Sequence, residues 1–486
     1  MPLVSSYGWL STWLLAVNLL IIITLVPRIV AQRRESAATL AWVLFILLVP
    51  LGGALAYHLL GTRRLRKRVR KRVKARARFA PVAGRVDGAL RAFAFDPSTH
   101  EVDDPDDNAM AGRIFAVDRS TATAGNDVLL LPEGPQAFEA LERAIGEAKH
   151  HVHALFYIFR PDETGRALLA LLAERARAGV EVRLLVDAVG SFELRPSDTR
   201  ALRDAGGKVA EFLPVSVLAK PFSVNFRNHR KVVVVDGRVA FTGGMNVGDE
   251  YRGRRTAQGG PWRDLLLRLR GPAALRLQEI FVDDWNYATD EGCFDPVYFP
   301  PPERPGRVVV QVVSSGPDSS HEAIYHSFFS AITGARQRVW LTTPYFIPDV
   351  AIFVALVTAA LRGVDVRLLL PGSSDHPLVL YAGQSYYEEL LAAGVRVFEF
   401  NRGFLHAKTM VVDHAWTALG SANMDMRSFR LNWEANVVAY DADLARSIAL
   451  AFVRDCEGAV EVKRPLVRSR WRRTREAGSY LLSPLL

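Results

Sequence analysis

Residues 229–246 of this 486-residue chain read HRKVVVVDGRVAFTGGMN, and residues 406–423 read HAKTMVVDHAWTALGSAN. Both stretches hold a histidine, a lysine, an aspartate, a Gly-Gly or Gly-Ser pair and a final asparagine, all at the same spacing. One such string could arise by chance, but two with equal spacing indicate a duplicated unit. Packing of a buried core does not require these polar residue types, so the repeat predicts a functional site.

Each copy also predicts a local structure. In the first copy, two runs of β-branched residues flank Asp-Gly, which is a strong signal for a hairpin with a two-residue turn. Side chains alternate along a strand, so the histidine and lysine of one motif lie on the same face. We therefore expect His229 to lie beside Lys231, and His406 beside Lys408.

The aspartates of the two motifs, Asp236 and Asp413, fall at the predicted turns. Two interpretations remain open for them. They either cap the turn or take part directly in catalysis. His414 occupies the turn position that Gly237 holds in the first copy, so we expect it to be a surface residue.

The segments before the two motifs repeat one order of elements. AKHHVHALFYIFRPD, GRALLALLAERARAG and VEVRLLVDAVG precede the first motif, and ARQRVWLTTPYFIPD, VAIFVALVTAALRG and VDVRLLLPG precede the second. Strand, helix and strand in this order predict βαβ units and parallel strands. The proline-rich stretch 300–306 is predicted to link the two halves.

An acidic residue follows a tryptophan after each hairpin, at the start of a predicted strand. These acids are Asp264 and Glu434. A catalytic histidine needs a partner on its second nitrogen to fix its tautomer. We expect Asp264 to pair with His229 and Glu434 with His406; the alternative is that both acids face solvent.

Two apolar segments begin the chain, at residues 9–26 and about 37–60, each near the ~20 residues that cross a bilayer. They predict two transmembrane helices, the second kinked at Pro50; the alternative is two buried core helices. A run with eleven Lys/Arg and no acid follows at residues 63–78. The positive-inside rule places this run in the cytoplasm, against the weaker pull of Arg28, Arg33 and Arg34 in the short loop.

Composition narrows the function classes. The net charge of +10 is concentrated in the run at residues 63–78, so a nucleic-acid-binding groove is not indicated. That run is expected to contact anionic lipid headgroups. The chain has only two cysteines, which favours a reducing compartment. No spacing typical of a metal site is seen, so we predict neither a metal nor another cofactor.

The paired HxKx4Dx6G[GS]xN motif resembles that of the phospholipase D superfamily. RNHRKVVVVDGRVAFTGGMNVGDEY, TTPYFIPD, GFLHAKTMVVD and GSANMDMRSFRLNWE, with the apolar leader, are similar to bacterial cardiolipin synthases. The resemblance implies an α/β fold of two phospholipase D-like βαβ-sandwich repeats that share one active site, preceded by two transmembrane helices. The predicted regions are the membrane segment 1–62, a basic segment and polar linker 63–110, in which residues 79–110 form the linker, and the repeats 111–305 and 306–486.

The same resemblance implies a two-step transfer at phosphorus. One histidine forms a phosphohistidine, and the other acts as acid and then as base. By analogy His229 is the nucleophile and His406 the acid/base, although the near-symmetric motifs leave the order open. The implied site also contains Lys231, Lys408, Asp236 and Asp413, with Asn246 and Asn423 as phosphate-binding residues.

Two activities fit these features. The first is a cardiolipin synthase that joins two phosphatidylglycerols and releases glycerol; the second is a hydrolase, either a phospholipase D or a nuclease. A membrane-tethered binding protein is disfavoured because both motifs are intact. A transferase must exclude water and admit a lipid hydroxyl, which favours a multi-pass protein of the cell membrane with its catalytic region facing the cytoplasm. The basic segment 463–475 around Trp471 is predicted to lie at the lipid interface, the alternative being a solvated tail. The expected partners are phosphatidylglycerol, cardiolipin and the membrane.

Overall fold

The computed structural model describes residues 5–31, 36–57, 65–96, 111–112, 114–116, 120–214, 225–254, 260–319, 322–466 and 468–481. Arg33, Arg34 and the predicted linker from residue 97 to 110 lie outside these ranges. Near residue 70 the chain divides into a smaller N-terminal unit and a larger unit that begins at Lys71.

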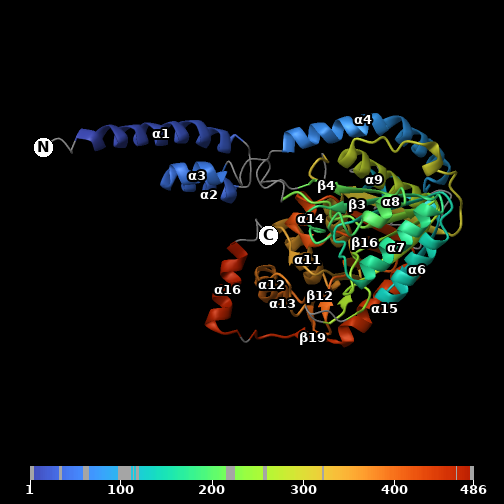
Figure 1. Cartoon of the computed structure of the whole chain (residues 1–486). Coiled ribbons are helices and arrows are strands. Elements are labelled where there is room, and N and C mark those ends of the chain that lie inside the picture. Colours follow the sequence, from blue (N-terminus) through green and yellow to red (C-terminus); the bar gives the residue numbers. More distant parts are fainter. Residues whose placement is uncertain are drawn as a thin grey trace. The chain divides into compact units, whose positions relative to one another are not determined.

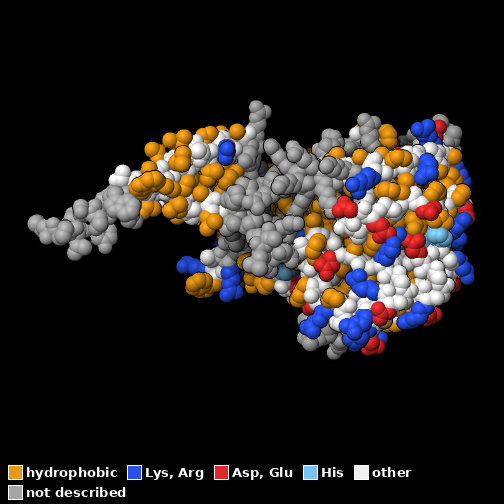
Figure 2. Space-filling model, turned by 45° about the horizontal axis from the view of Figure 1, so that its top comes forward, with side chains coloured by type: hydrophobic (Ala, Val, Ile, Leu, Met, Phe, Trp, Pro, Cys, Tyr) orange, Lys and Arg blue, Asp and Glu red, His pale blue; other side chains and the backbone are white. Residues whose placement is uncertain are grey.

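The first apolar segment of the N-terminal unit is one helix, α1 (Ser5–Val30). Within it, Thr12–Val30 is long and apolar enough to cross a membrane, with a mean hydropathy of 2.2. Most of its described side chains are hydrophobic, and many of these are exposed, as the orange surface in Figure 2 shows. An apolar surface of this kind is stable against lipid rather than water.

The second apolar segment is divided into α2 (Ser36–Leu48) and α3 (Pro50–Ala56). The break falls immediately before Pro50, as predicted, because proline lacks the amide that would continue the helix. Ile29 of α1 and Ile46 of α2 are both buried, and they belong to one small apolar cluster. The described residues thus contain one helix that is long enough to span a membrane, and the second predicted span is two shorter helices.

The prediction of a linker from residue 79 is wrong for residues 79–90, which are helical. Helix α4 (Leu65–Leu90) continues through residue 79 without interruption. Its apolar residues recur every three or four positions, which is the spacing of one buried helix face. That face packs into the core beside α9 (Pro272–Thr289), as the blue and olive helices of Figure 1 show; it consists of Ala75, Phe79, Val82, Val86 and Leu90. The many arginines around this stripe obscured it in the sequence.

A sheet of fifteen strands runs through the described part of the larger unit, in the order β19-β13-β12-β10-β15-β16-β18-β9-β1-β8-β6-β5-β2-β3-β4. The duplication is visible in this order, because seven strands of one half repeat in mirrored sequence in the other. The halves join where β1 pairs with β9 in antiparallel fashion. The first half contains β1 (Thr123–Leu131), β2 (His151–Phe156), β3 (Glu181–Asp187), β4 (Lys208–Phe212), β5 (Val232–Val235), β6 (Val239–Gly243) and β8 (Leu266–Arg270). The second half contains β9 (Val308–Ser315), β10 (Arg338–Thr342), β12 (Asp365–Pro371), β13 (Arg396–Phe400), β15 (Thr409–Val412), β16 (Trp416–Gly420), β18 (Glu434–Tyr440) and β19 (Ala459–Val462).

The predicted βαβ units are confirmed. Strands β2 and β3 are parallel and are joined by α7 (Glu163–Arg177); β10 and β12 are parallel and are joined by α11 (Val350–Leu361). The larger unit also contains α6 (Gly134–Gly146), α8 (Arg200–Asp204), α10 (Ala323–Gly334), α12 (Pro377–Gln384), α13 (Tyr387–Ala392), α14 (Met426–Arg430), α15 (Ala442–Glu457) and α16 (Arg470–Leu481).

Helices cover both faces of the sheet. Because side chains alternate along a strand, neighbouring residues of one strand are buried under helices on opposite sides. In β5, Val233 and Val235 pack with the residues of α6 and α7, whereas Val232 and Val234 pack with α9 and α15. The predicted hairpins are also present, but each turn has three residues rather than two. Val235 pairs with Val239, so the turn consists of residues 236–238.

Candidate active site

The histidine and lysine of each motif lie just before the first strand of its hairpin, and all four side chains are buried. Lys231 Nζ donates to the carbonyl of His229 at 2.6 Å. Lys408 Nζ donates to the carbonyl of His406 and lies 2.9 Å from its Nδ1. The predicted proximity of each histidine to its lysine is confirmed.

Each histidine binds a carboxylate from the opposite half of the chain. His229 Nδ1 lies 3.0 Å from both carboxylate oxygens of Glu434, and His406 Nδ1 lies 2.6 Å from Asp264 Oδ2. The expectation that each acid serves the histidine of its own repeat is therefore wrong. The two motifs complete each other, so neither half contains a full His–acid pair.

Strand register explains the crossed pair at His406. The short strands β7 (Trp262–Arg263) and β14 (Phe404–Leu405) pair in parallel, with Leu405 opposite Arg263. One residue further along, His406 comes beside Asp264. The amide of His406 donates to the carbonyl of Arg263 at 2.8 Å, which fixes this register.

The same arrangement recurs at His229. Asn228 forms a parallel bridge with Trp433, and the amide of His229 donates to the Trp433 carbonyl at 2.9 Å. The next residue on the opposite strand is Glu434. The tryptophan-acid pairs noted in the sequence thus form the strand that lies beside the other repeat's histidine.

The two acids differ in their surroundings. Glu434 also accepts a hydrogen bond from Ser421 Oγ and one of 3.1 Å from Asn432 Nδ2. Burial raises its pKa, but His229, Lys231 and Ser421 outweigh burial and hold the pKa below its ordinary value. Burial raises the pKa of Asp264 to about 6. Glu434 is therefore the more firmly ionised of the two.

Burial disfavours the charged forms of the two lysines and the two histidines. Burial lowers the pKa of Lys231 to about 7 and that of Lys408 to about 8. It lowers the pKa of His229 to about 4, and that of His406 well below its ordinary value. With both lysines charged, both acids ionised and both histidines neutral, these six groups carry no net charge. An anionic phosphodiester adds one negative charge, which favours protonation of one imidazole.

Comparison with known proteins identifies the chain's relatives. A family model described as "Cardiolipin synthase, PLD-like domain" matches residues 141–254 and 328–456, which include both motifs and Glu434. The chain is 39% identical over 463 residues to a cardiolipin synthase of Geobacillus kaustophilus, covering 94% of this chain and 90% of that protein. It is 40% identical over 461 residues to cardiolipin synthase 2 of Bacillus anthracis, covering 94% of this chain and 88% of that protein.

The chain belongs to the phospholipase D-like cardiolipin synthase family. A second model, described as "Phospholipase_D-nuclease N-terminal", matches the apolar leader at residues 14–61. Among solved structures, a phosphatidylserine synthase of Haemophilus influenzae has the same fold, with a TM-score of 0.59 and 14% identity over 78% of this chain and 99% of that one.

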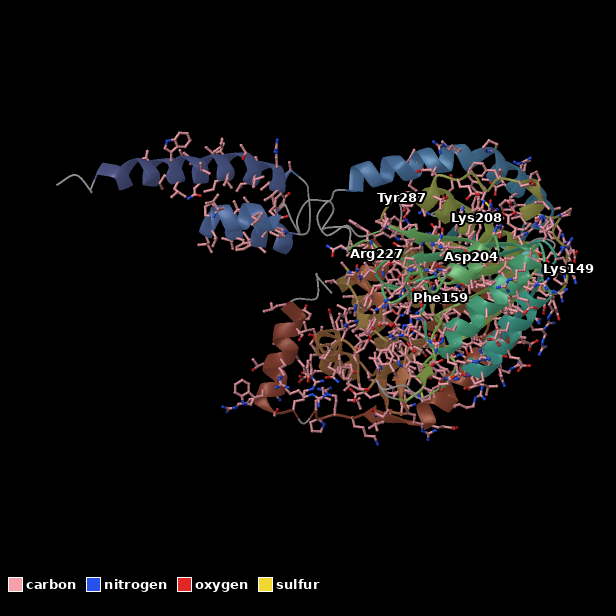
Figure 3. All side chains as sticks on the ribbon, viewed as in Figure 1. Lys149, Phe159, Asp204, Lys208, Arg227 and Tyr287 are labelled. Atoms are coloured by element: carbon pink, nitrogen blue, oxygen red, sulfur yellow. The ribbon has the colours of Figure 1, made fainter. Side chains whose placement is uncertain are left out.

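The motif aspartates of this cardiolipin synthase family member lie away from the histidines. The carboxylate of Asp236 accepts three backbone amide hydrogen bonds of 2.8–2.9 Å, from residues 149–151. At ~3.3 Å per residue, strand β5 separates Asp236 from Lys231 by about 16 Å. In Figure 3, Lys149 lies at the right-hand edge of the larger unit, and Arg227, two residues before His229, lies on its left side.

Asp413 repeats this arrangement, with three amides of residues 336–338 bound at 2.7–3.2 Å. Both aspartates have positive φ angles, 54° and 48°, which they adopt at the hairpin turns. A direct catalytic role for Asp236 and Asp413 is wrong on this geometry, and turn capping is the role that their contacts support. His414 is exposed, as expected of a turn residue.

The two motif asparagines differ. Asn246 is held at both ends, because its Oδ1 accepts from the Ile158 amide at 3.0 Å and its Nδ2 donates to Tyr251 Oη at 2.9 Å. Asn423 Oδ1 is buried and has no hydrogen-bond partner among the described residues. Asn423 Oδ1 can therefore still accept a hydrogen bond from a ligand, whereas both side-chain polar atoms of Asn246 already have one partner each.

Aromatic residues outside the two motifs lie against the histidines. The ring of Tyr157 lies 4.8 Å from that of His229, and its centroid lies 5.4 Å from Lys231 Nζ. Tyr251 and Trp262 lie 5.4 and 5.2 Å from His406. Tyr157 directly follows β2, and the carboxyl ends of parallel strands commonly carry ligand-binding residues. This position at the end of a predicted strand was the sequence feature that could have indicated a site role for Tyr157.

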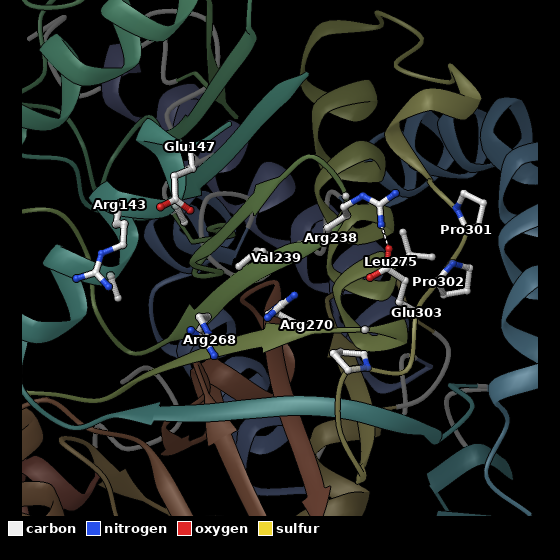
Figure 4. A pocket seen from close by; sticks show the side chains of 15 residues that line it. Arg143, Glu147, Arg238, Val239, Arg268, Arg270, Leu275, Pro301, Pro302 and Glu303 are labelled. Atoms are coloured by element: carbon white, nitrogen blue, oxygen red, sulfur yellow. Dashed lines mark hydrogen bonds and ion pairs between the residues drawn. The ribbon is translucent and has the colours of Figure 1, made fainter. Parts of the chain in front are cut away.

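A cavity of about 370 Å³ lies elsewhere in the larger unit, between α6, the proline-rich linker and the hairpin end of β6 (Figure 4). Four arginines and two glutamates line it: Arg143, Arg238, Arg268, Arg270, Glu147 and Glu303. Three of these arginines are already paired with carboxylates, namely Arg143–Glu139, Arg238–Glu303 and Arg268–Asp127. It lies beside Val239, whereas the active-site end of β6 is Gly243, so this cavity is not the catalytic one.

Proposed function

We propose that this chain is a phosphatidyltransferase that joins two phosphatidylglycerol molecules into cardiolipin and releases glycerol. The observation that carries the proposal is the crossed pair of His–carboxylate contacts, because each contact joins a motif histidine of one half to an acid of the other half. Two imidazoles supply a nucleophile and an acid/base, and the lysines supply positive charge for the phosphate oxygens.

The first step forms a phosphohistidine. His229 Nε2 attacks phosphorus, the bond from phosphorus to the glycerol oxygen breaks, and His406 donates its Nε2 proton to that oxygen. In the second step His406 removes a proton from the hydroxyl of another phosphatidylglycerol. The resulting oxygen attacks phosphorus, the P–N bond breaks, and His229 is restored. One P–O ester bond replaces another, so no activated donor is required.

The surroundings of the two histidines support this order. Glu434 is firmly ionised, so it accepts a hydrogen bond from the Nδ1–H group of His229, which keeps that proton on Nδ1 and leaves the Nε2 lone pair for attack. His406 Nδ1 faces both Asp264 and the ammonium of Lys408. In this setting the proton that His406 transfers at Nε2 is more easily lost and regained. We therefore assign the nucleophile to His229 and the acid/base to His406. Asn246 and Asn423 are proposed to orient the phosphate through their side-chain Nδ2 groups, which can donate to its oxygens.

The catalytic region is proposed to face the cytoplasm and to rest on the membrane. Exposed apolar side chains lie on α11, at Val350, Val354 and Leu361, and on α16, at Trp471. The ring of Tyr386 lies 5.3 Å from Phe353 of α11 and 5.6 Å from Tyr480 of α16, so the two helices lie close together. Arginines at 470, 472, 473 and 475 add positive charge to α16. Such a face is suited to an anionic lipid surface.

The membrane anchor is proposed to be multi-pass, with α1 as the first span and α2 with α3 as the second. The eleven positive charges that follow at residues 63–78 favour the cytoplasmic side for the rest of the chain. A lipid hydroxyl would then reach the site from the bilayer, and the aromatic residues around the histidines would limit the entry of water.

Product analysis tests the proposal. Purified full-length enzyme in phosphatidylglycerol vesicles should yield cardiolipin and glycerol in equal amounts, and excess glycerol should reverse the reaction. The His229→Ala variant should yield neither product. Phosphatidic acid as the main product of the unmodified enzyme would show that water is the acceptor, and the hydrolase alternative would replace this proposal.

A further inference from the structure

Arg72 is one of the eleven positive charges that the sequence assigns to the membrane surface, yet its side chain is 1% exposed. It extends from α4 into the larger unit and forms ion pairs with three aspartates: Asp283 at 2.7 Å, Asp284 at 2.5 Å and Asp318 at 3.0 Å. These three pairs outweigh the effect of burial and raise its pKa above the ordinary value. A guanidinium is suited to this position because its fork of N–H groups can serve several carboxylates at once.

One branch of this network leads to the residues on either side of His229. Asp284 accepts from Asn228 Nδ2 at 2.8 Å, and both of its oxygens accept from Arg230 Nη1 at 2.9 Å. Arg230 Nε donates to the backbone carbonyl of Glu434 at 3.1 Å. Because Asp284 is shared, the position of Arg72 is coupled to both neighbours of the proposed nucleophile.

The second branch leads to the carboxylate that His229 binds. Asp318 accepts from the indole nitrogen of Trp433, the residue before Glu434. The guanidinium carbon of Arg72 also lies 5.4 Å from the ring of Trp433. Since the Trp433 carbonyl accepts from the amide of His229, the two branches meet at the His229–Glu434 pair.

His406 has different neighbours. It lies between Leu405 and Ala407, both fully buried and without polar side chains. Beside His406, the strand residue Arg263 pairs with Asp455 instead, so among the described residues the Arg72 network acts on His229. A nucleophile must be held in line with the phosphorus atom, and this is the histidine that the network holds.

We propose that Arg72 is a positioning residue of the active site, which holds His229 and Glu434 in the geometry for attack. This inference rests on the proposed function, because it concerns the step in which His229 forms the phosphohistidine. It makes the helix that follows the membrane segment in the sequence a structural part of the catalytic centre.

The test compares Arg72→Lys and Arg72→Gln with Arg85→Gln in the full-length enzyme in vesicles. Arg85 lies on the same helix, outside the basic run, and its side chain is exposed, so it controls for the loss of one positive charge from α4. We expect Arg72→Gln to lower kcat by about 10²–10³-fold with KM within about threefold, because substrate binding is retained and attack is impaired. Arg72→Lys should recover part of the loss, and Arg85→Gln should stay within about twofold of the unmodified enzyme.

Two measurements separate a positioning role of Arg72 from simple unfolding. They are thermal melting and the fraction of chains that can be labelled as phosphohistidine. Rates per labelled site should remain low in Arg72→Gln if the proposal is right. Normal rates per labelled site, with only fewer active chains, would show a purely structural role and overturn it, as would equal losses in Arg72→Gln and Arg85→Gln. Should the unmodified enzyme release phosphatidic acid instead of cardiolipin, the proposed function fails, while the effect of Arg72 on the rate of phosphohistidine formation is still measured.

Discussion

The crossed pairing of histidines and acids predicts that Glu434→Gln and Asp264→Asn impair different steps. Glu434 should act on the nucleophile, His229, and Asp264 on the acid/base, His406. A substrate whose leaving group needs no proton separates the two. Phosphatidyl-p-nitrophenol is such a substrate, because p-nitrophenolate leaves as a stable anion.

The magnitude follows from the contacts of Glu434. Its two oxygens accept from His229, Ser421 and Asn432, so a glutamine amide places an N–H group against at least one donor. If that N–H faces His229 Nδ1, the imidazole proton moves to Nε2 and blocks attack. The corresponding wrong tautomer in serine protease triads costs about 10⁴ in kcat. We expect a loss of about 10³–10⁴, or roughly 4–5.5 kcal/mol at about 1.4 kcal/mol per decade.

The assay is the first-turnover release of p-nitrophenol from vesicles, compared with glycerol release from phosphatidylglycerol. Glu434→Gln should lose both activities. Asp264→Asn should lose glycerol release by about 10²–10⁴-fold, which is the range that general acid catalysis contributes, yet keep p-nitrophenol release within about tenfold. The opposite result, with Asp264→Asn alone losing p-nitrophenol release, would refute the assignment of His229 as the nucleophile paired with Glu434.

Three further outcomes are expected. Burial lowers the pKa of Lys231 to about 7 and that of Lys408 to about 8, so kcat/KM should fall as pH rises through 7–8 and the lysines lose their charge; a profile flat to pH 9.5 would contradict this. Asp413→Ala should lower stability by about 2–3 kcal/mol through loss of three amide contacts, with kcat per folded molecule within about threefold, as thermal melting and rate measurements can check. Activity of washed enzyme should survive EDTA, since Lys231 and Lys408 supply the cationic charge; a complete loss reversed by zinc or magnesium would overturn that interpretation.

Topology was also predicted from the sequence. A cysteine introduced at Arg34 should react with an impermeant reagent added outside the cell, and one at Asp103 should not, because the basic run favours the cytoplasm for the remainder of the chain. The reverse labelling pattern would contradict the charge argument.

Local patterns in the sequence predicted much of the fold. Alternating and 3.6-residue periodicities are properties of short stretches, so the βαβ units, the hairpins and the break at Pro50 could all be inferred before the structure was known. The helical stripe from Ala75 to Leu90 was equally local, but the basic residues between its members hid it. The identities of the histidines and lysines of the site were inferable for a related reason: a duplicated motif shows which polar residues both copies keep.

Contacts between residues far apart in the chain could not be inferred in this way. The sequence indicated that Asp264 and Glu434 serve the two histidines, but the pairing depends on which strand lies beside which. Leu405 lies opposite Arg263, and Asn228 opposite Trp433, only because the two halves fold against each other. The burial of Arg72 among three aspartates depends on the same packing. The sequence by itself therefore determined which groups perform the chemistry, and only the tertiary structure decided which acid serves which histidine, because long-range register is set by packing between the halves and not by local spacing.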